Sequence, residues 1–512
     1  INRKIMKKIF YLSIIAGLVS LTSCNEEKLE TFPTDEVSVE QIFSSADAAQ
    51  TAVNGIYRAM FMNGWSDSWS SENPGIMGTL LFKDLQGEDH LMANQGNGWF
   101  YYDYSFGTDA DYTHSSGRQY AQWNLYYTIA SQANYVIAQA ERLNSFGNEG
   151  KYVLAQGYAL RGFAYFWLYN IYCQGNYAEN SDAPGVPLYT EPTTPDTKGK
   201  GRGTVAEVFE QINSDYKTAV ELFTEADVAQ KNIMNIDLYA TYALWARVAL
   251  AQEDWNNAYL YATEALKKPG LTRVATMDEL GAFNDINIPS LFWGFEVIAD
   301  QTGPYGPFMS HMDLNGGYGK TAQQCIDAWL WNNISNTDYR KTDWWDNPAD
   351  YSVYPYAQFK FQYKNLATAT ADMVYMRAEE MILVAAEAAC RNREFETARN
   401  LLTELGEKRD STYTRRLAAL TDEVTYNSNT HAPVITLMEE ILFQRRVELW
   451  SEGMGRAYDL SRLNLGYSRN YDGSNHTSKK VLEPGDVMFV TLIPQKEFDS
   501  NDSISIEDQN PR

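Results

Sequence analysis

Apolar side chains recur along this chain at the spacing of an α-helix, and this pattern limits the folds open to it more than any other feature. The clearest stripe begins at Val205, and its apolar positions recur at three- and four-residue intervals as far as Phe223. Thr204 and Glu207 have the spacing of a capping box, which marks the start of that helix. Similar stripes lie within 49–60, 123–140 and 160–171. The periodicity therefore predicts a mostly α-helical protein.

Two segments, 238–268 and 375–405, each have the pattern of two helices joined by a short turn. In the first segment, small residues and a proline stand at the spacing of a tetratricopeptide repeat: Ala246, Ala258, Ala265 and Pro269. The second repeats the pattern more weakly, with Ala386, Ala389 and Ala398. These residues predict a tetratricopeptide-like scaffold of helical pairs. Ordinary helical hairpins, which need the same close approach, are the alternative.

Long stretches without helical periodicity separate these helices. The two longest, about 63–112 and 267–349, are rich in aromatic, glycine and asparagine residues. Loops this long in a compact domain are usually functional. We therefore expect a helical scaffold with long irregular loop excursions that form a ligand-binding face.

The beginning of the chain has the features of an exported lipoprotein. Basic residues at 3–8 precede a short apolar run at 9–20, and the run ends in Leu21-Thr22-Ser23-Cys24. That ending resembles the bacterial lipobox, in which the cysteine is acylated and becomes the first residue after cleavage. We expect a signal peptide over 1–23, lipidation at Cys24 and a tether over 24–45. The acidic Glu26 and Glu27 resemble the surface-export signal of Bacteroidetes lipoproteins.

Charge and cysteine content exclude several classes of protein. The net charge of −24 argues against nucleic-acid binding, because lysine and arginine must neutralise phosphates there. Three cysteines remain beyond Cys24, without metal-like spacing, so we expect neither a disulfide framework nor a zinc site. The 35 Tyr, 22 Phe and 13 Trp exceed what is usual, and some of these rings are candidates for ligand stacking.

Several short segments resemble, in order along the chain, motifs of the SusD/RagB family. They are LRGFAYFWLYNIY at 160–172 with GVPL at 185–188, ARVAL at 246–250, MRAEE at 376–380, EILFQRRVEL at 440–449 with YDLSR at 458–462, and IP at 493–494. Each motif alone is weak, but their order behind a lipobox is specific and covers nearly the whole mature chain. The segment 454–456 spaces its Gly and Arg slightly differently from the common pattern, which we interpret as harmless variation.

This resemblance implies a SusD-like α-helical domain over 46–512 in a protein anchored by lipid to the outer membrane and facing the exterior. Such a protein captures nutrients, generally glycans, and delivers oligosaccharide to a SusC-like TonB-dependent transporter without catalysis. The motifs are mainly scaffold in this family, so Arg445, Glu448 and Asp459 are expected in buried salt bridges between helices. The alternatives are a tetratricopeptide-type protein–protein scaffold, a peptide-binding RagB-like uptake component and a secreted glycoside hydrolase.

Candidate binding residues follow from the chemistry of a sugar, which has an apolar face and a rim of hydroxyl groups. An exposed aromatic ring flanked by polar side chains suits both. The segment 86–104 has this composition, and in the family the loop at this position lies in the ligand-binding region. Its candidates are Asp89, Asn97, Trp99, Tyr101 and Tyr102, with Trp99 the strongest.

Further aromatic candidates lie outside that segment. Trp65 and Trp69 stand upstream among glycine, serine and asparagine residues. The second excursion contributes Tyr305, Trp329 and Trp331 as a second candidate group.

Catalytic and metal motifs are few. The chain contains no HExxH, GxSxG, P-loop or GxGxxG arrangement, and its five histidines are scattered. Two short segments, 109–111 and 284–287, have the acidic and amide oxygens that calcium prefers. Calcium is thus the one cofactor that the loops suggest.

Overall fold

The computed structural model describes residues 39–66, 73–107, 113–303 and 305–512 of the chain. The predicted signal peptide, Cys24, Trp69 and the segment 109–111 lie outside these residues. No helix within the described ranges is both long and apolar enough to cross a membrane.

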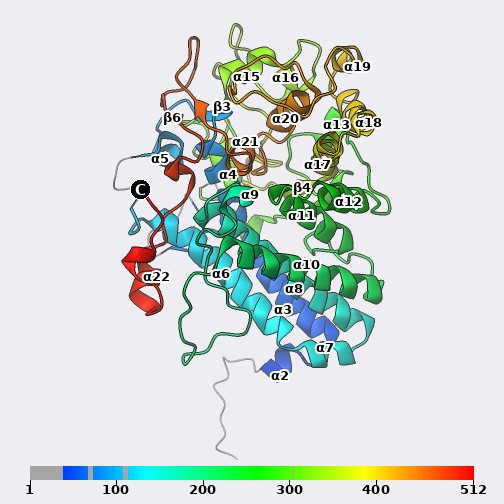
Figure 1. Cartoon of the computed structure of the whole chain (residues 1–512), viewed down its shortest axis with the longest axis vertical. Coiled ribbons are helices and arrows are strands. Elements are labelled where there is room, and N and C mark those ends of the chain that lie inside the picture. Colours follow the sequence, from blue (N-terminus) through cyan, green and yellow to red (C-terminus); the bar gives the residue numbers. More distant parts are fainter. Residues whose placement is uncertain (1–38, 67–72, 108–112, 304) are drawn as a thin grey trace, which may run out of the picture.

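A bundle of long helices forms the lower half of the molecule in Figure 1. It comprises α3 (Ala46–Met60), α6 (Gly117–Ile137), α7 (Ala140–Ser145), α8 (Asn148–Tyr172) and α10 (Val205–Ala226). Helix α8 packs against α3, α6, α7 and α10, and most of its side chains are buried. The capping box of Thr204 and Glu207 starts α10 as the sequence predicts. The four predicted stripes therefore correspond to α3, α6, α8 and α10.

Two helical pairs continue from this bundle. The first is α11 (Leu238–Ala251) with α12 (Trp255–Ala265), and the second is α17 (Ala378–Arg391) with α18 (Phe395–Gly406). Helix α10 packs on α11, α11 on α12, α12 on α17 and α17 on α18. Ala246, Ala258 and Ala398 are fully buried, as expected for small residues that allow close helix approach. The paired helices are confirmed, and their tetratricopeptide character stays a prediction.

The first excursion is more regular than predicted. It contains α4 (Gly75–Gln86), β1 (His90–Met92) and α5 (Tyr101–Ser105). Every side chain of α4 is buried, so the helix has no polar face and its sequence shows no amphipathic stripe. Periodicity alone cannot detect such a helix.

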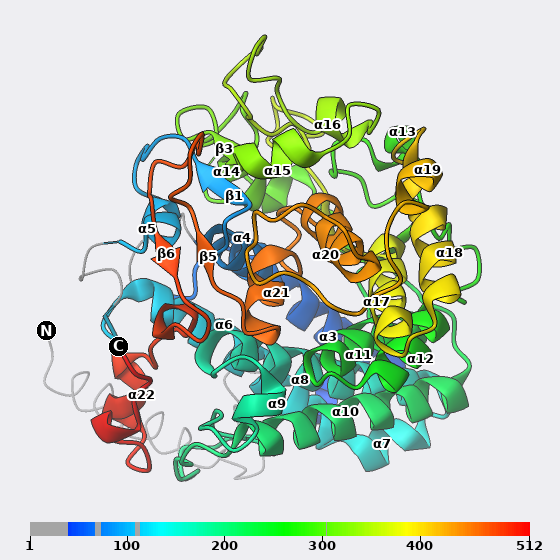
Figure 2. The same ribbon diagram turned by 45° about the horizontal axis from the view of Figure 1, so that its top comes forward.

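The second excursion also contains short elements. They are α13 (Met277–Leu280), β2 (Leu291–Phe295), η2 (Ala299–Gln301), α14 (Phe308–Met312), β3 (Gln324–Ile326), α15 (Ala328–Asn333) and α16 (Arg340–Asp343). Strand β2 pairs antiparallel with β4 (Met373–Arg377), which leads into α17. Strand β3 pairs antiparallel with β1, with His90 opposite Ile326 and Met92 opposite Gln324. The β1–β3 pair joins the two excursions, and Figure 2 shows it beside α14.

Shorter elements complete the chain. They are α2 (Val39–Ile42), α9 (Tyr177–Asn180), α19 (Tyr413–Leu417), α20 (Leu437–Glu448), α21 (Arg456–Arg462), β5 (Tyr467–Ser468), β6 (Val481–Leu482), η3 (Val487–Phe489), α22 (Gln495–Ser500) and η4 (Ile506–Asp508). Strands β5 and β6 form a third antiparallel pair.

Helix α20 anchors the second excursion through a buried carboxylate. Glu448 binds Arg340 of α16 at 2.8 Å, Arg377 of β4 at 2.7 Å and Arg409 at 2.9 Å, and all four side chains are fully buried. Burial alone would raise the pKa of Glu448, but the three guanidinium groups hold it well below its usual range. Arg445 and Asp459, which the sequence also placed in buried salt bridges, pair with each other at 2.9 Å.

The same helix anchors the first excursion. Arg446 binds Asp89 at 2.5 Å and Glu88 at 3.2 Å, and Arg456 of α21 binds Glu88 at 2.9 Å. Side chains two positions apart in α20 therefore tie both excursions to the scaffold.

Candidate functional site

The loop between β1 and α5 has a backbone that only certain residues adopt easily. Gly96, Gly98 and Phe100 all have positive φ values, of 53°, 92° and 61°. A Cβ atom on Gly96 would stand 2.8 Å from the Cβ of Ala322, and one on Gly98 would stand 2.9 Å from the ring of Tyr102. Glycine thus permits both the turn and its close approach to the second excursion.

Trp99, near the end of this loop, meets aromatic rings of the second excursion. Its ring centroid lies 6.2 Å from that of Tyr318 in an edge-to-face arrangement, and Tyr305 lies 5.2 Å from Tyr318 on another side. Tyr305 is 60% exposed and Trp99 is partly buried. Trp99, Tyr305 and Tyr318 form what we call the aromatic group.

Tyr318 was not among the residues predicted from the sequence. It is 8% exposed and lies within the run Gly316-Gly317-Tyr318-Gly319. Gly317 has φ +55°, and the backbone N–H of Tyr318 donates to the carbonyl of Ser310 at 2.6 Å. The sequence feature that could have indicated Tyr318 is its position as a single aromatic residue among three glycines.

Buried rings support the aromatic group from below. His311 stacks on Tyr318 with centroids 4.9 Å apart, and Phe100 meets His311 edge-on at 4.8 Å. The guanidinium of Arg118 lies 4.6 Å from the centre of the Phe100 ring and forms a 2.7 Å ion pair with Asp103. This stack holds the base of the group rigid.

Polar side chains border the aromatic group. Asn94 donates a 2.7 Å hydrogen bond to the Gln323 side chain, which again joins the two excursions. Gln95 donates to the hydroxyl of Tyr102 at 3.1 Å, and Tyr102 meets Tyr101 edge-on at 6.2 Å. Asn97 is exposed. The predicted residues Asn97, Trp99, Tyr101 and Tyr102 therefore share one loop and its following helix.

Asp89 lies in the interior and not on the surface of this loop. From the sequence we expected it on the ligand-binding surface, and its burial contradicts that placement. It is 2% exposed, and both of its carboxylate oxygens accept hydrogen bonds from Arg446. A carboxylate buried this deeply needs such a partner. Its role in the structure is to hold the excursion on α20.

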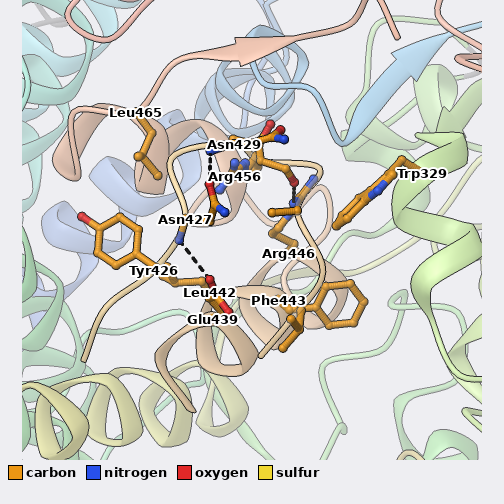
Figure 3. A pocket seen from close by; sticks show the side chains of 13 residues that line it. Trp329, Tyr426, Asn427, Asn429, Glu439, Leu442, Phe443, Arg446, Arg456 and Leu465 are labelled. Atoms are coloured by element: carbon orange, nitrogen blue, oxygen red, sulfur yellow. Dashed lines mark hydrogen bonds between the residues drawn. The ribbon is translucent and has the colours of Figure 1, made fainter. Parts of the chain in front are cut away.

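Trp329 lies in a different environment from Tyr305, although both belong to the second excursion. Its ring lies 5.2 Å from His431 and 5.0 Å from the Arg446 guanidinium. It borders a small cavity of about 50 Å³ whose lining also includes Tyr426 and Asn429 (Figure 3). The volume holds little more than a water or two.

Trp331 and Trp65 also stand apart from the aromatic group in their contacts. Trp331 meets Tyr356 edge-on at 5.6 Å and carries Lys341 over its face at 4.3 Å. Trp65 is partly buried, and its indole N–H donates to the carbonyl of Met62 at 3.0 Å. The sequence placed Tyr305 in one candidate group with Trp329 and Trp331. In the structure, Tyr305 and Trp99 instead share a contact with Tyr318.

The calcium hypothesis finds no support in the second of its two segments. Lys364 binds both Asp285 and Asp372, at 2.9 and 3.3 Å, so these two acids already share an ammonium partner. Hydrogen bonding from Asn287 and this lysine lowers the pKa of Asp285. Across the described ranges, no three His, Cys, Asp or Glu side chains gather in a way that would hold a metal ion.

The fold and this surface define a helical protein that presents aromatic rings on two joined loop excursions. Two family models match the chain: one described as starch-binding and associating with the outer membrane covers 79–250, and one described as the SusD family covers 312–511. The chain belongs to the SusD/RagB family.

Similar proteins agree with this assignment. SusD-like protein P2 of Formosa agariphila is 25% identical over 97% of this chain and 95% of its own length. A SusD-like carbohydrate-binding protein from Bacteroides vulgatus has a TM-score of 0.73 at 22% identity, over 91% of this chain and 98% of that one. Surface glycan-binding protein A from Bacteroides thetaiotaomicron, solved with laminarihexaose, has a TM-score of 0.64 at 16% identity, over 91% and 99%. At these identities the solved structures establish the fold.

Proposed function

We propose that this chain is an outer-membrane surface lipoprotein that binds oligosaccharides without catalysis and delivers them to a SusC-like TonB-dependent transporter. The observation that carries the proposal is the convergence of Trp99, Tyr305 and Tyr318 where the two excursions meet. Family membership supports it, as does the laminarihexaose complex of a protein with the same fold.

The chemistry of the aromatic group suits a sugar. A pyranose ring packs its C–H face on an aromatic face, and Tyr305 offers such a face to solvent. Asn94, Asn97 and Gln323 supply amide donors and acceptors at the border for sugar hydroxyl groups. The buried stack under Tyr318 keeps the group in place before a ligand arrives, which lowers the entropic cost of binding.

The lipid anchor and the surface location rest on the sequence around Cys24. Three acyl chains bury enough methylene groups for durable anchoring, at about 0.8 kcal/mol per CH₂. Replacement Cys24→Ser tests this directly. We expect the variant to lose incorporation of radiolabelled palmitate and to leave the membrane fraction, and retention of the label would contradict the assignment.

The hydrolase alternative is disfavoured by the placement of the adjacent acids Glu88 and Asp89. Both bind Arg446 in the interior, whereas glycoside hydrolysis uses two carboxyl groups facing a substrate across about 5–10 Å. Release of shorter products from malto-, cello-, laminari- or xylo-oligosaccharides would contradict the non-catalytic part of the proposal.

The proposal is tested by calorimetric titration of the folded mature domain with malto-, cello-, laminari- and xylo-oligosaccharides and with a mixture of casein peptides. We expect saturable binding of at least one oligosaccharide series and none of the peptides. Binding of the peptides alone would replace the proposal by the RagB-like alternative. Binding of neither class would favour a protein–protein scaffold.

A further inference from the structure

A second aromatic cavity lies on the flank of the helical bundle, between α6, the loop 187–200 and α22. It has a volume of about 460 Å³, which is within the range of small-ligand pockets. Its lining consists of Trp123, Tyr127, Thr128, Ala130, Ser131, Gln132, Tyr189, Thr193 and Glu497. None of these residues belongs to the aromatic group. Figures 1 and 2 place α6 and α22 side by side, below α5. We call this second aromatic cavity the side cavity.

Three aromatic rings form its apolar wall. Trp123 lies 4.7 Å from Tyr127, and Tyr127 meets Tyr189 at 6.2 Å with ring planes 76° apart. Two rings at such an angle form a corner that presents one face and one edge. Tyr127 and Tyr189 are both partly exposed, while Trp123 is buried behind them.

The polar atoms of these rings are all satisfied within the protein, so the rings are held in fixed positions. Tyr127 donates its hydroxyl proton to the carbonyl of Pro187 at 2.8 Å, and the backbone N–H of Lys200 donates to the hydroxyl of Tyr189 at 3.0 Å. The indole of Trp123 donates to Glu497 at 3.1 Å, and Asn501 donates to the other oxygen of that carboxylate at 2.7 Å. A preorganised wall of this kind loses little entropy on binding.

The rim differs from the wall because its side chains are available. Ser131 and Gln132 form no side-chain hydrogen bond to any other residue in the part of the chain that the structure describes. The hydroxyl and the amide can both donate and accept.

Glu497 is the charged residue of the lining. The ammonium group of Lys200 lies 5.6 Å from the centre of the Tyr189 ring and donates to the carbonyl of Leu188 at 2.8 Å. Negative charge disfavours phosphorylated and uronic-acid ligands.

We propose that the side cavity is a second, independent binding site for a neutral oligosaccharide. An apolar corner for the C–H face, a hydroxyl and amide rim and a carboxylate as the charged group of the lining together fit an uncharged pyranose. The inference extends the proposed function to a new surface but does not depend on the aromatic group. Two sites that share no residue would hold two stretches of one polysaccharide at once, which raises avidity.

The test uses variants of both sites in the full mature chain. Trp99→Ala with Tyr305→Ala, the aromatic-group variant, removes two of the three rings of the aromatic group and leaves the mostly buried Tyr318. Ser131→Trp fills the side cavity. Ala138→Trp, at the exposed end of α6, is the matched control. Each protein is titrated by calorimetry with neutral malto-, cello-, laminari- and xylo-oligosaccharides and with an oligoglucuronide.

We expect the aromatic-group variant to retain weak, saturable binding of a neutral oligosaccharide and no binding of the oligoglucuronide. Adding Ser131→Trp should weaken that residual binding at least tenfold, whereas adding Ala138→Trp should not. If Ser131→Trp impairs folding, Gln132→Leu replaces it, because this change keeps the volume and removes the amide.

The inference would be overturned if Ser131→Trp and Gln132→Leu left the residual binding unchanged. It would also be overturned if the aromatic-group variant bound no oligosaccharide. Loss of all binding through Ser131→Trp alone, with the aromatic-group variant unaffected, would support the side cavity and contradict the proposed principal site. The two failures are therefore distinguishable.

Discussion

The ion pairs around α20 and the aromatic group both involve residues of the two excursions, yet they differ in burial. Glu448 and Arg446 are buried and ion-paired, whereas Tyr305 is 60% exposed. The arginine-rich segment of α20 therefore holds the excursions in place. We propose that ligand contact falls to residues outside that segment.

The largest expected effect comes from removing the buried carboxylate at the centre of the network. Glu448→Ala leaves Arg340, Arg377 and Arg409 without their common partner, so it should lower the free energy of unfolding by about 3–5 kcal/mol. Urea unfolding measures this. A loss below about 1 kcal/mol would mean that the buried charges do not anchor the excursion.

Acid should weaken the same network. The arginines around Glu448 and Glu452 hold both pKa values below their usual range, against the opposing effect of burial. A carboxylate with a depressed pKa contributes stability above its unfolded value of about 4.3 and loses it as the pH falls through the folded value. The free energy of unfolding should therefore fall below about pH 4.3, and Glu448→Gln should flatten that slope. An identical slope in this variant would contradict the assignment.

A smaller effect is expected from Asp89→Asn, which tests whether this residue stabilises the fold or contacts the ligand. The amide keeps one hydrogen bond to Arg446 but loses the charge, so stability should drop by about 1–3 kcal/mol while oligosaccharide affinity stays constant. Urea unfolding and calorimetry on the same preparation separate the two. Weakened binding at unchanged stability would restore Asp89 as a ligand contact.

The smallest effect is expected at an exposed ion pair of similar geometry. Arg273 binds Glu404 at 2.7 Å, but both side chains are more than a third exposed. Arg273→Ala should cost at most about 1 kcal/mol in urea unfolding, and less at high salt. If Arg273→Ala lowered the free energy of unfolding as much as Glu448→Ala, burial would not explain the difference between the two ion pairs.

The sequence predicted the scaffold well because α10 is amphipathic and the other long helices carry apolar or small residues at regular helical spacing. Helix α10, with its capping box, and the pairs α11–α12 and α17–α18 follow directly from apolar spacing and small residues. Helix α4 was missed because every side chain in it is buried, which leaves no stripe to detect.

The sequence predicted which aromatic residues could belong to the site, but not which of them lie close together. Trp99 and Tyr305 were both chosen as candidates, yet their meeting at Tyr318 depends on the pairing of β1 with β3. That pairing joins segments far apart in the chain, and three-residue strands carry almost no pattern. Asp89 was misassigned because a sequence does not show whether an acid has a buried arginine partner.

We propose that Trp99 and Tyr305 contact the ligand, while the buried charges only hold their loops in position. This proposal is tested most directly by calorimetric titration of the double variant Trp99→Ala, Tyr305→Ala with the oligosaccharide that the wild type binds best. Tyr339→Ala, which removes a tyrosine that is 49% exposed near α16, is the control. We predict an affinity at least about tenfold lower in the double variant, or about 1.4 kcal/mol, with unchanged urea unfolding and an unaffected control. Wild-type affinity in the double variant would contradict the claim.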